Sequence, residues 1–130
     1  MKSQGSLILL VDDSKDNREM YAYFLMREGF RVSLASDGQE ALDNAAKLQP
    51  DLIIMDLSLP VISGWEATRR LKADEKTKHI PVVTLSAYGD GLESIAGCEG
   101  SLTKPCLPGV MVEEIDRILG KQPRRETPGP

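Results

Sequence analysis

The sequence has few of the residues that mark several classes of protein. It holds only two cysteines and one histidine, too few for a disulfide framework or a cysteine–histidine zinc site. Its net charge is −4, which argues against direct binding of nucleic acid. No apolar run approaches the length of a signal sequence or a membrane-spanning helix. We therefore expect one cytoplasmic domain with reduced thiols and no membrane insertion.

One apolar run ends on a carboxylate. Residues 52–55 are all apolar and Asp56 follows them directly. Four consecutive apolar residues without alternation are typical of a strand covered on both faces of a parallel sheet. In open α/β sheets the functional crevice lies outside the carboxyl ends of the strands. We therefore expect Asp56 to be presented to solvent at that edge rather than buried.

The rest of the chain repeats a pattern of strand followed by helix. Four further strands are predicted at 7–11, 31–35, 80–85 and 101–103, of which 31–35 alternates like a strand nearer a sheet edge. Helices are predicted from about Lys15 to Gly29, from Asp37 to before Pro50, from Ser63 to Ala73, in a short glycine-rich stretch at 92–96, and from Pro108 to Gly120.

Apolar residues at helical spacing predict which side chains these helices bury. They are Met20, Tyr21, Phe24 and Leu25 in the first helix, Ala41, Leu42, Ala45 and Leu48 in the second, Thr68 and Leu71 in the third, and Met111, Ile115, Ile118 and Leu119 in the last.

Strands that alternate with helices pair in parallel through right-handed crossovers, with helices on both faces. The most apolar strands, at 7–11, 52–56 and 80–85, belong in the middle, and the order 2-1-3-4-5 satisfies this. The prediction is a flavodoxin-like, doubly wound, five-stranded parallel sheet of (βα)5 form with a shortened fourth helix. Residues 6–120 form the domain, 1–5 a flexible N-terminus and 121–130 a disordered tail or linker stub.

Charged and polar residues follow four of the five strands: Asp12 and Asp13, Asp56, Ser86 and Lys104. A parallel sheet brings these ends to one edge, where neighbouring strands lie about 5 Å apart. Two carboxylates about 4 Å apart repel by roughly 4 kcal/mol at an effective dielectric constant of about 20. A divalent cation together with one lysine can offset that repulsion, and a few oxygen ligands favour Mg²⁺ over Zn²⁺.

The same set of groups suits phosphoryl transfer to a carboxylate. Asp56 would attack phosphorus in line, and Mg²⁺ and Lys104 would neutralise charge on the equatorial oxygens. Ser86 would donate a hydrogen bond to one of those oxygens. Aspartyl phosphate is an activated anhydride, so the modification is expected to be temporary.

With these residues in place, the chain resembles a receiver domain of a two-component response regulator over residues 6 to 120. The resemblance rests on ILLVDDSKDNREM at the first strand, IIMDLSLPVISGWE around Asp56, VVTLSAY at the fourth strand and LTKPC at the fifth. It implies Asp56 as phosphoacceptor, Asp13 and Asp56 as direct Mg²⁺ ligands with the Ser58 backbone carbonyl, and Asp12 acting mainly through water. Ser86 takes the place of the switch threonine or serine, and Lys104 that of the phosphate-binding lysine.

The resemblance also implies partners. A sensor histidine kinase or a histidine phosphotransfer protein would donate the phosphoryl group, and phosphorylation would pull Ser86 inward and change binding of a downstream protein target. The domain would be no enzyme beyond its own phosphorylation and dephosphorylation. Two departures stand out: Ser101 replaces the usual aromatic residue three positions before Lys104, and the segment between Ser86 and Lys104 is short and glycine-rich.

Two other families fit the same residues less well. A haloacid-dehalogenase-type phosphatase would need a second aspartate at Ser58, and the acidic loop after the first strand would repel the phosphate of a flavin. A receiver-like module that binds a partner constitutively, without phosphorylation, stays open because of Ser101 and the short segment. So does the choice between a stand-alone receiver and a fragment of a longer regulator or hybrid kinase.

Overall fold

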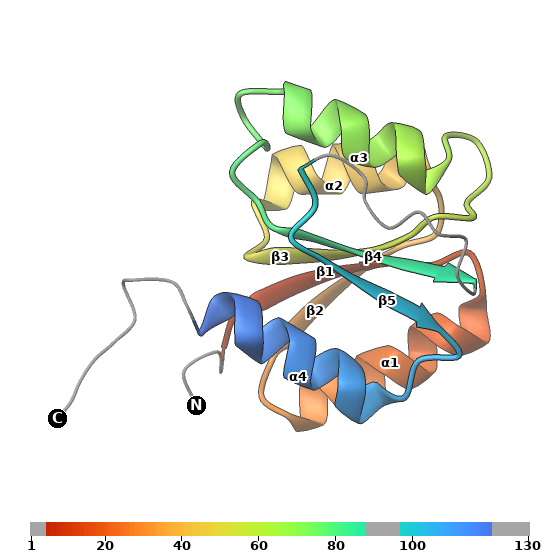
Figure 1. The fold of residues 1–130 in the computed structure, drawn as a ribbon, viewed down its shortest axis with the longest axis vertical. Coiled ribbons are helices and arrows are strands. Elements are labelled where there is room, and N and C mark those ends of the chain that lie inside the picture. The colour runs from red at the N-terminus through yellow and green to blue at the C-terminus, as the bar shows by residue number, and fades with distance from the viewer. Residues whose placement is uncertain (1–4, 88–96, 121–130) are drawn as a thin grey trace, which may run out of the picture.

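The computed structural model describes residues 5–87 and 97–120. Its elements, in chain order, are β1 (Leu7–Val11), α1 (Lys15–Arg27), β2 (Arg31–Ala35), α2 (Gly38–Leu48), β3 (Leu52–Asp56), α3 (Gly64–Ala73), β4 (Val82–Ala87), β5 (Gly100–Lys104) and α4 (Pro108–Leu119). The strands form one parallel sheet in the order β2-β1-β3-β4-β5 (Figure 1). This is the predicted flavodoxin-like order.

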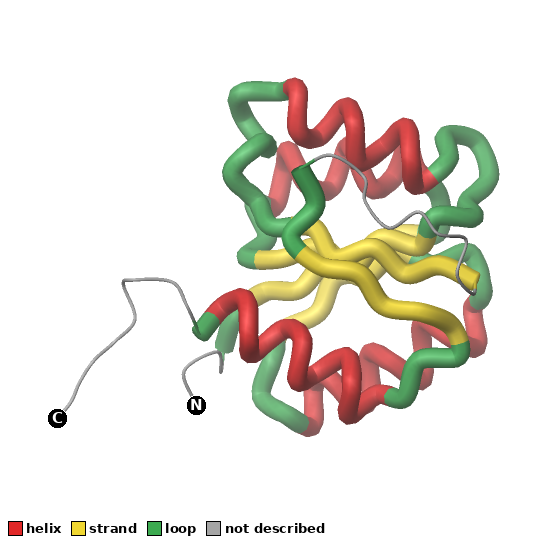
Figure 2. Tube along the Cα trace, in the orientation of Figure 1, coloured by secondary structure: helices red, strands yellow, loops and turns green. Residues whose placement is uncertain are grey.

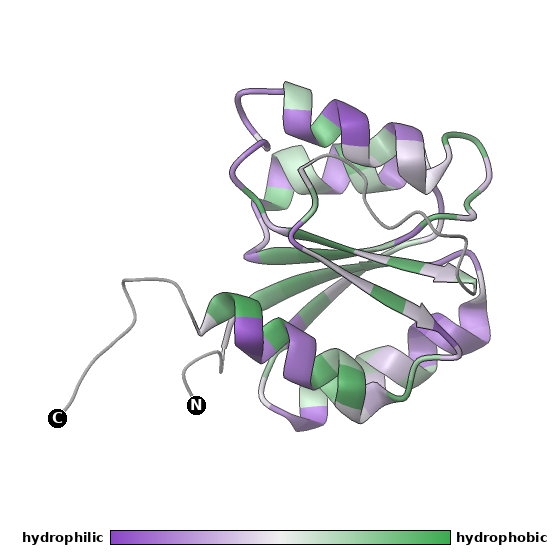
Figure 3. Ribbon diagram, in the orientation of Figure 1, coloured by the Kyte–Doolittle hydropathy of each residue, from purple (hydrophilic) through white to green (hydrophobic). Residues whose placement is uncertain are grey.

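Helices cover both faces of the sheet. In Figures 1 and 2, α2 and α3 lie on one side of the strands and α1 and α4 on the other. Because successive side chains of a strand point to opposite faces, each central strand contributes side chains to two hydrophobic cores, one on each face of the sheet. Leu10 and Ile54 pack in the core under α1 and α4, whereas Leu9 and Ile53 pack in the core under α2 and α3. Figure 3 shows largely hydrophobic central strands, and helices that carry both hydrophobic and hydrophilic residues.

Polar side chains begin three of the helices. Ser14, Asp37 and Ser63 each accept a hydrogen bond from the backbone amide three residues further on. These bonds satisfy amides that a helix leaves without an internal partner at its first turn. The predicted starts of α1, α2 and α3 are therefore confirmed.

The predicted inner faces are confirmed for α4 and α3 but only in part for α1 and α2. Tyr21 and Leu25 are buried, whereas Met20 and Phe24 are about two-fifths exposed, at 41% and 40%. The buried stripe of α1 is centred on Tyr21, Ala22 and Leu25, so Met20 and Phe24 lie at its border. Leu48, at the last turn of α2, is also exposed.

The fourth strand is displaced from its prediction by two residues, to Val82–Ala87. Ile80 donates its amide to Thr77 in a turn, and Pro81 has no amide hydrogen for a ladder. The carboxyl end extends to Ala87 because Ser86 and Ala87 pair with Thr103 and Lys104 of β5.

The short helix predicted at 92–96 lies outside the described residues, as do the predicted N-terminal and C-terminal segments at 1–4 and 121–130. Among the four helices that the structure describes, none has the length and apolarity to cross a membrane. Cys98 and Cys106 are both free thiols.

Candidate functional site

Asp56 is the last residue of β3 and is fully buried, which corrects the prediction that it is presented to solvent. Its Oδ1 accepts the amide hydrogen of Ser58 at 2.9 Å, and its Oδ2 accepts a hydrogen bond from the Lys104 ammonium at 3.0 Å. The carboxylate lies at the predicted strand end, but it has no exposed surface there. Both oxygens are therefore paired rather than hydrated, as buried charge requires.

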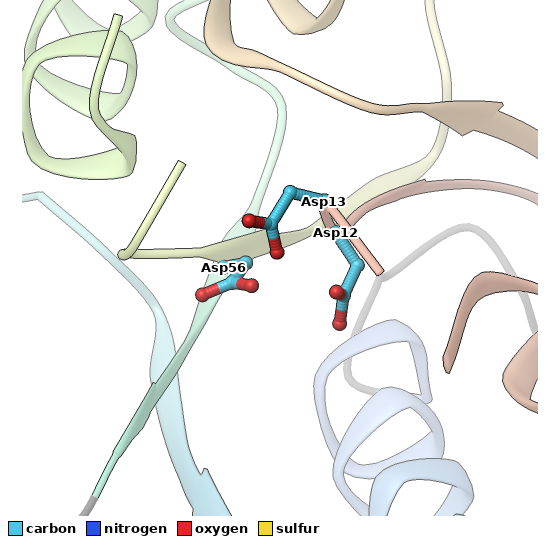
Figure 4. Close-up of side chains that lie close together, drawn as sticks. All are labelled: Asp12, Asp13 and Asp56. Carbon is cyan, nitrogen blue, oxygen red and sulfur yellow. The ribbon is translucent and has the colours of Figure 1, made fainter. Parts of the chain in front are cut away.

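Asp12 and Asp13 follow β1, the neighbour of β3 in the sheet. Carboxylate oxygens of Asp12, Asp13 and Asp56 all lie within 4.8 Å of one another. Figure 4 shows the Asp13 carboxylate pointing toward Asp56. Asp12 is fully buried and Asp13 is exposed, so the cluster opens to solvent on the Asp13 side. The predicted convergence of the three acids is confirmed.

Strand alternation explains which groups share the α1–α4 side of the sheet. Asp56 lies two residues after Ile54, and Lys104 lies two residues after Leu102, and both of these apolar side chains belong to the core under α1 and α4. Residues two apart in a strand point to the same face. Asp12 continues β1 in the same way, because its amide still donates to the Ala35 carbonyl of β2 at 3.1 Å.

The electrostatic balance of the cluster is negative. With all three carboxylates ionised, the Lys104 ammonium neutralises one of three negative charges and leaves two. Burial raises the pKa of Asp56 above its ordinary value of 3.8, more than the hydrogen bonds from Ser58 and Lys104 lower it, and the nearby Asp12 raises it further. The repulsion among the carboxylates therefore costs free energy, and a bound cation would remove that cost.

The structure also places the three serines that the sequence analysis singled out, Ser58, Ser86 and Ser101. Ser58 is exposed, and its amide faces Asp56. Ser86 is half-buried in β4 next to Thr103 of β5. Within the described residues, no hydrogen bond joins the Ser86 hydroxyl to Asp56 or Lys104. Ser101, three positions before Lys104, is exposed on β5.

A close backbone contact shapes the loop that follows Asp56. The Gly64 amide donates to the Leu57 carbonyl at 3.2 Å, so the loop returns to the strand end before α3 begins. A Cβ atom at Gly64 would lie 2.0 Å from the carbonyl oxygen of Asp56. Gly38, at the start of α2, is as close to the Ile62 carbonyl of this loop. Both positions require glycine because no side chain fits there.

Arg18 is a site residue that the sequence reasoning missed. Its guanidinium donates to the backbone carbonyl of Asp12 at 2.9 Å, and the Asp12 carboxylate in turn accepts the Ser14 amide. These bonds fix the loop that carries Asp12 and Asp13. A basic residue one helical turn after the Ser14 cap is the sequence signal that could have indicated it, because it can reach back over the first turn.

The oxygen set fits a hard divalent cation. Asp12 Oδ2 is buried and has no hydrogen-bond partner in the described part of the chain, so an oxygen lone pair is available inside the cluster. Buried polar atoms without partners are rare and costly. A site with a small number of carboxylates and room for bound water suits Mg²⁺. Asp12, Asp13 and Asp56 are therefore the residues that could hold the metal.

Comparison with known proteins identifies relatives of the same kind. The family model of the response regulator receiver domain matches residues 8–116. The polar-differentiation response regulator DivK of Brucella ovis is 37% identical over 118 residues, which is 87% of this chain and 95% of that protein. DivK of Brucella anthropi is 36% identical over the same length.

Solved structures agree with this assignment. The receiver domain of sensor histidine kinase PA1611 from Pseudomonas aeruginosa has a TM-score of 0.82 and 32% identity, with 90% of this chain and 99% of that chain covered, and a magnesium ion is coordinated in its active site cleft. The chemotaxis response regulator CheY4 of Vibrio cholerae has a TM-score of 0.80 and 30% identity, with 88% and 99% covered. The chain belongs to the response regulator receiver domain family of two-component signalling systems.

Proposed function

We propose that this domain accepts a phosphoryl group on Asp56 from a phosphohistidine of a sensor histidine kinase or a histidine phosphotransfer protein, in a step that requires Mg²⁺. The observation that carries the proposal is the buried Asp56 carboxylate, which contacts Lys104 at 3.0 Å and lies within 4.8 Å of Asp12 and Asp13 oxygens. A structural carboxylate has no need of two further acids beside it, because they only add repulsion.

In the proposed step, an Asp56 carboxylate oxygen attacks phosphorus, and an O–P bond forms as the N–P bond of phosphohistidine breaks. The imidazole nitrogen keeps the electron pair and takes up a proton. Lys104 moves its hydrogen bond to a phosphoryl oxygen, and Ser86 donates to another after an inward movement of the end of β4. Asp13, Asp56 and the Ser58 backbone carbonyl would hold Mg²⁺ directly and Asp12 mainly through water, and the cation would supply neutralisation of charge on the phosphoryl oxygens. Water later hydrolyses the acyl phosphate.

The phosphodonor protein is proposed to dock on the α1–α4 side. A pocket of about 590 Å³ opens there between α1 and the residues after β5. Two apolar side chains of its lining, Met20 and Leu107, are 41% and 70% exposed. Lys104 lines the pocket and also contacts Asp56. A helix that carries phosphohistidine and apolar neighbours would cover this surface and bring phosphorus to the carboxylate.

Residues 6–120 are proposed as the receiver unit, acting in the cytoplasm where kinase catalytic domains operate. The outcome of phosphorylation would be changed binding of a downstream protein.

A constitutive interaction module is the second candidate. Ser101 favours it, because an exposed serine on β5 cannot supply the inward movement of an aromatic ring that the family usually couples to phosphorylation. The two candidate functions differ in whether Asp56 becomes phosphorylated.

The deciding experiment is the intact mass of the protein after incubation with acetyl phosphate, with and without Mg²⁺. The native chain should gain one phosphoryl group only with Mg²⁺, and Asp56→Asn should gain none. Asp51→Asn is a matched control, because Asp51 is exposed at the opposite end of β3, and it should be labelled like the native chain. If the native chain stays unlabelled while another receiver is labelled in the same tube, the constitutive module is favoured.

A further inference from the structure

A buried hydroxyl joins α1 to the segment that follows Lys104. Tyr21 is 5% exposed, and its Oη donates to the backbone carbonyl of Cys106 at 2.7 Å, across 85 positions of sequence. A buried hydroxyl without a partner is costly, so the bond keeps both groups in place. Cys106 lies two residues after Lys104, in the turn that connects β5 to α4.

Cys106 is buried in the core under α1 and α4, but few side-chain hydrogen bonds fix the turn. In the described part of the chain, Tyr21 is the only side chain of another element that hydrogen-bonds residues 105–107. Leu107, before α4, provides no side-chain cap, and Pro105 has no amide hydrogen. The pocket of about 590 Å³ adjoins the same residues, so there is open space on that side of the turn.

We propose that Tyr21 is a positioning residue for Lys104. Its hydroxyl fixes the carbonyl of Cys106 and thereby the end of β5, so that the Lys104 ammonium stays 3.0 Å from Asp56. The inference rests on the proposed function, because it assigns Tyr21 a part in phosphoryl transfer through Lys104. Tyr21 itself touches neither the phosphoryl group nor Mg²⁺. Small displacements of a charged donor weaken its hydrogen bond steeply.

The test removes one oxygen. Tyr21→Phe keeps the ring in the core and deletes the bond to Cys106, and Tyr23→Phe on the same helix is the control because Tyr23 is 58% exposed. The rate of phosphorylation by acetyl phosphate should fall by up to about tenfold in Tyr21→Phe, the factor that one buried hydrogen bond can supply. It should be unchanged in Tyr23→Phe. Tyr21→Phe should bind Mg²⁺, measured by calorimetry, at least as tightly as the native chain, because release of the Lys104 ammonium leaves the acidic cluster more negative. A general loss of structure would weaken Mg²⁺ binding instead.

The Lys104→Ala background separates positioning from folding. If Tyr21 acts through Lys104, Tyr21→Phe should have no further effect on the rate when Lys104 is already alanine. An undiminished loss in that background would overturn the inference, and so would equal rates for Tyr21→Phe and the native chain.

A crystal structure of Tyr21→Phe decides the question without phosphorylation. The inference expects the Lys104 ammonium to leave Asp56, and an unchanged contact of about 3.0 Å overturns it. If the native chain is not phosphorylated, the proposed function fails, and this crystal structure still tests the positioning role. If the native chain is phosphorylated and Tyr21→Phe behaves identically, only the positioning role fails.

Discussion

At the scale of single residues, the site places two fully buried carboxylates next to each other. Asp12 and Asp56 end neighbouring strands, and one oxygen of Asp12 has no hydrogen-bond partner in the described chain. Without a metal, this arrangement costs free energy of folding, because each charge has left water and faces another of the same sign. The cost is the physical origin of metal affinity here, since a bound cation removes it.

Asp12→Asn should therefore stabilise the protein in the absence of Mg²⁺ while it weakens Mg²⁺ binding. We expect the free energy of unfolding to rise by about 1 kcal/mol, the lower end of the gains seen when buried charges are replaced. Urea unfolding with EDTA measures the first effect and calorimetry the second. Asp16→Asn is the control, because Asp16 is exposed in the first turn of α1 and its loss should slightly destabilise the helix. A less stable Asp12→Asn protein would contradict the account.

The pH dependence of stability should reveal the buried charge of Asp56. Its pKa is raised above 3.8 by burial, so the folded state disfavours the ionised form. The stability that Asp56 contributes is complete below the unfolded pKa and is lost as pH rises through the folded pKa. Asp56→Asn should thus be more stable than the native chain at pH 7 without Mg²⁺, and the gap should close as pH falls toward 3.8. Urea titrations between pH 7 and pH 4 measure this.

Addition of Mg²⁺ provides the control for that series. The cation favours the ionised carboxylate, so saturating Mg²⁺ should narrow or reverse the gap at pH 7. A gap that does not vary with pH would show that Asp56 contributes through packing rather than charge.

The sequence could predict which residues meet at the site but not how deeply each is buried. Asp12, Asp13 and Asp56 follow apolar runs, Lys104 follows the short strand predicted at 101–103, and a parallel sheet brings such ends together. The burial of Asp56 depends on tertiary contacts such as that with Lys104, and no local pattern encodes that packing. The bond from Tyr21 to Cys106 joins residues 85 positions apart, so it could not be read from neighbouring residues. The roles assigned to Ser58 and Ser86 remain predictions.

At the scale of elements, the loop between β3 and α3 is the most constrained connection around the site. It leaves Asp56, turns, and comes back so closely that Gly64 touches the backbone it started from. Ser63 then caps α3, while the Glu66 carboxylate pairs with Arg69 and Arg70 instead of returning to the cap. The position of α3 is thus tied directly to the end of β3.

Gly64→Ala should destabilise the protein strongly. An ideal Cβ would lie 2.0 Å from the Asp56 carbonyl oxygen and 2.7 Å from Leu57 Cα, so backbone must move. We expect a loss of about 3 kcal/mol in free energy of unfolding and weaker Mg²⁺ binding. Gly109→Ala is the matched control in α4, because no atom lies within 4 Å of its Cβ position, and it should be neutral or up to about 1 kcal/mol stabilising. Equal effects of the two substitutions would refute the steric account.

Element types and order follow well from the sequence, because apolar runs, caps and prolines are local signals. The boundaries are less certain where tertiary pairing decides them. Residues 86–87 join β4 because β5 lies beside them, and the sequence of β4 alone carries no mark of that partner. Likewise Met20 and Phe24 have the spacing of core residues, but the position of α1 on the sheet leaves them at the border of the buried stripe.

At the scale of the whole molecule, the two helical layers present different surfaces. On the α1–α4 side, the exposed side chains of Met20 and Leu107 line the pocket next to Lys104. On the α2–α3 side, Leu48 and Trp65 are exposed but do not belong to the lining of this pocket. Exposed apolar groups that line a pocket indicate binding more strongly than single ones scattered over a surface. The difference makes the docking proposal testable without knowledge of the downstream target.

Leu107→Asp should slow phosphoryl transfer from a phosphorylated histidine phosphotransfer protein that labels the native chain. Leu107 is 70% exposed, so burial against the donor would desolvate the new charge. We expect a loss of about tenfold or more in kcat/KM, because interface anchors contribute upwards of 1 kcal/mol. Leu48→Asp, 39% exposed on the other layer, should behave like the native chain. Labelling by acetyl phosphate should be unaffected in both, and an equal effect of the two substitutions on protein-donor transfer would place the donor elsewhere.

The close approach of Gly64 to the Asp56 carbonyl has an optical consequence. Trp65 is the only tryptophan, and it follows directly the glycine that lies against the acceptor strand. Its side chain is 41% exposed, so its indole is partly in water and its emission responds to charge and polarity nearby. Because Gly64 lies against the Asp56 carbonyl, we expect rearrangement at Asp56 to change the surroundings of this fluorophore. Stopped-flow emission would then time events at the site in solution without any attached dye.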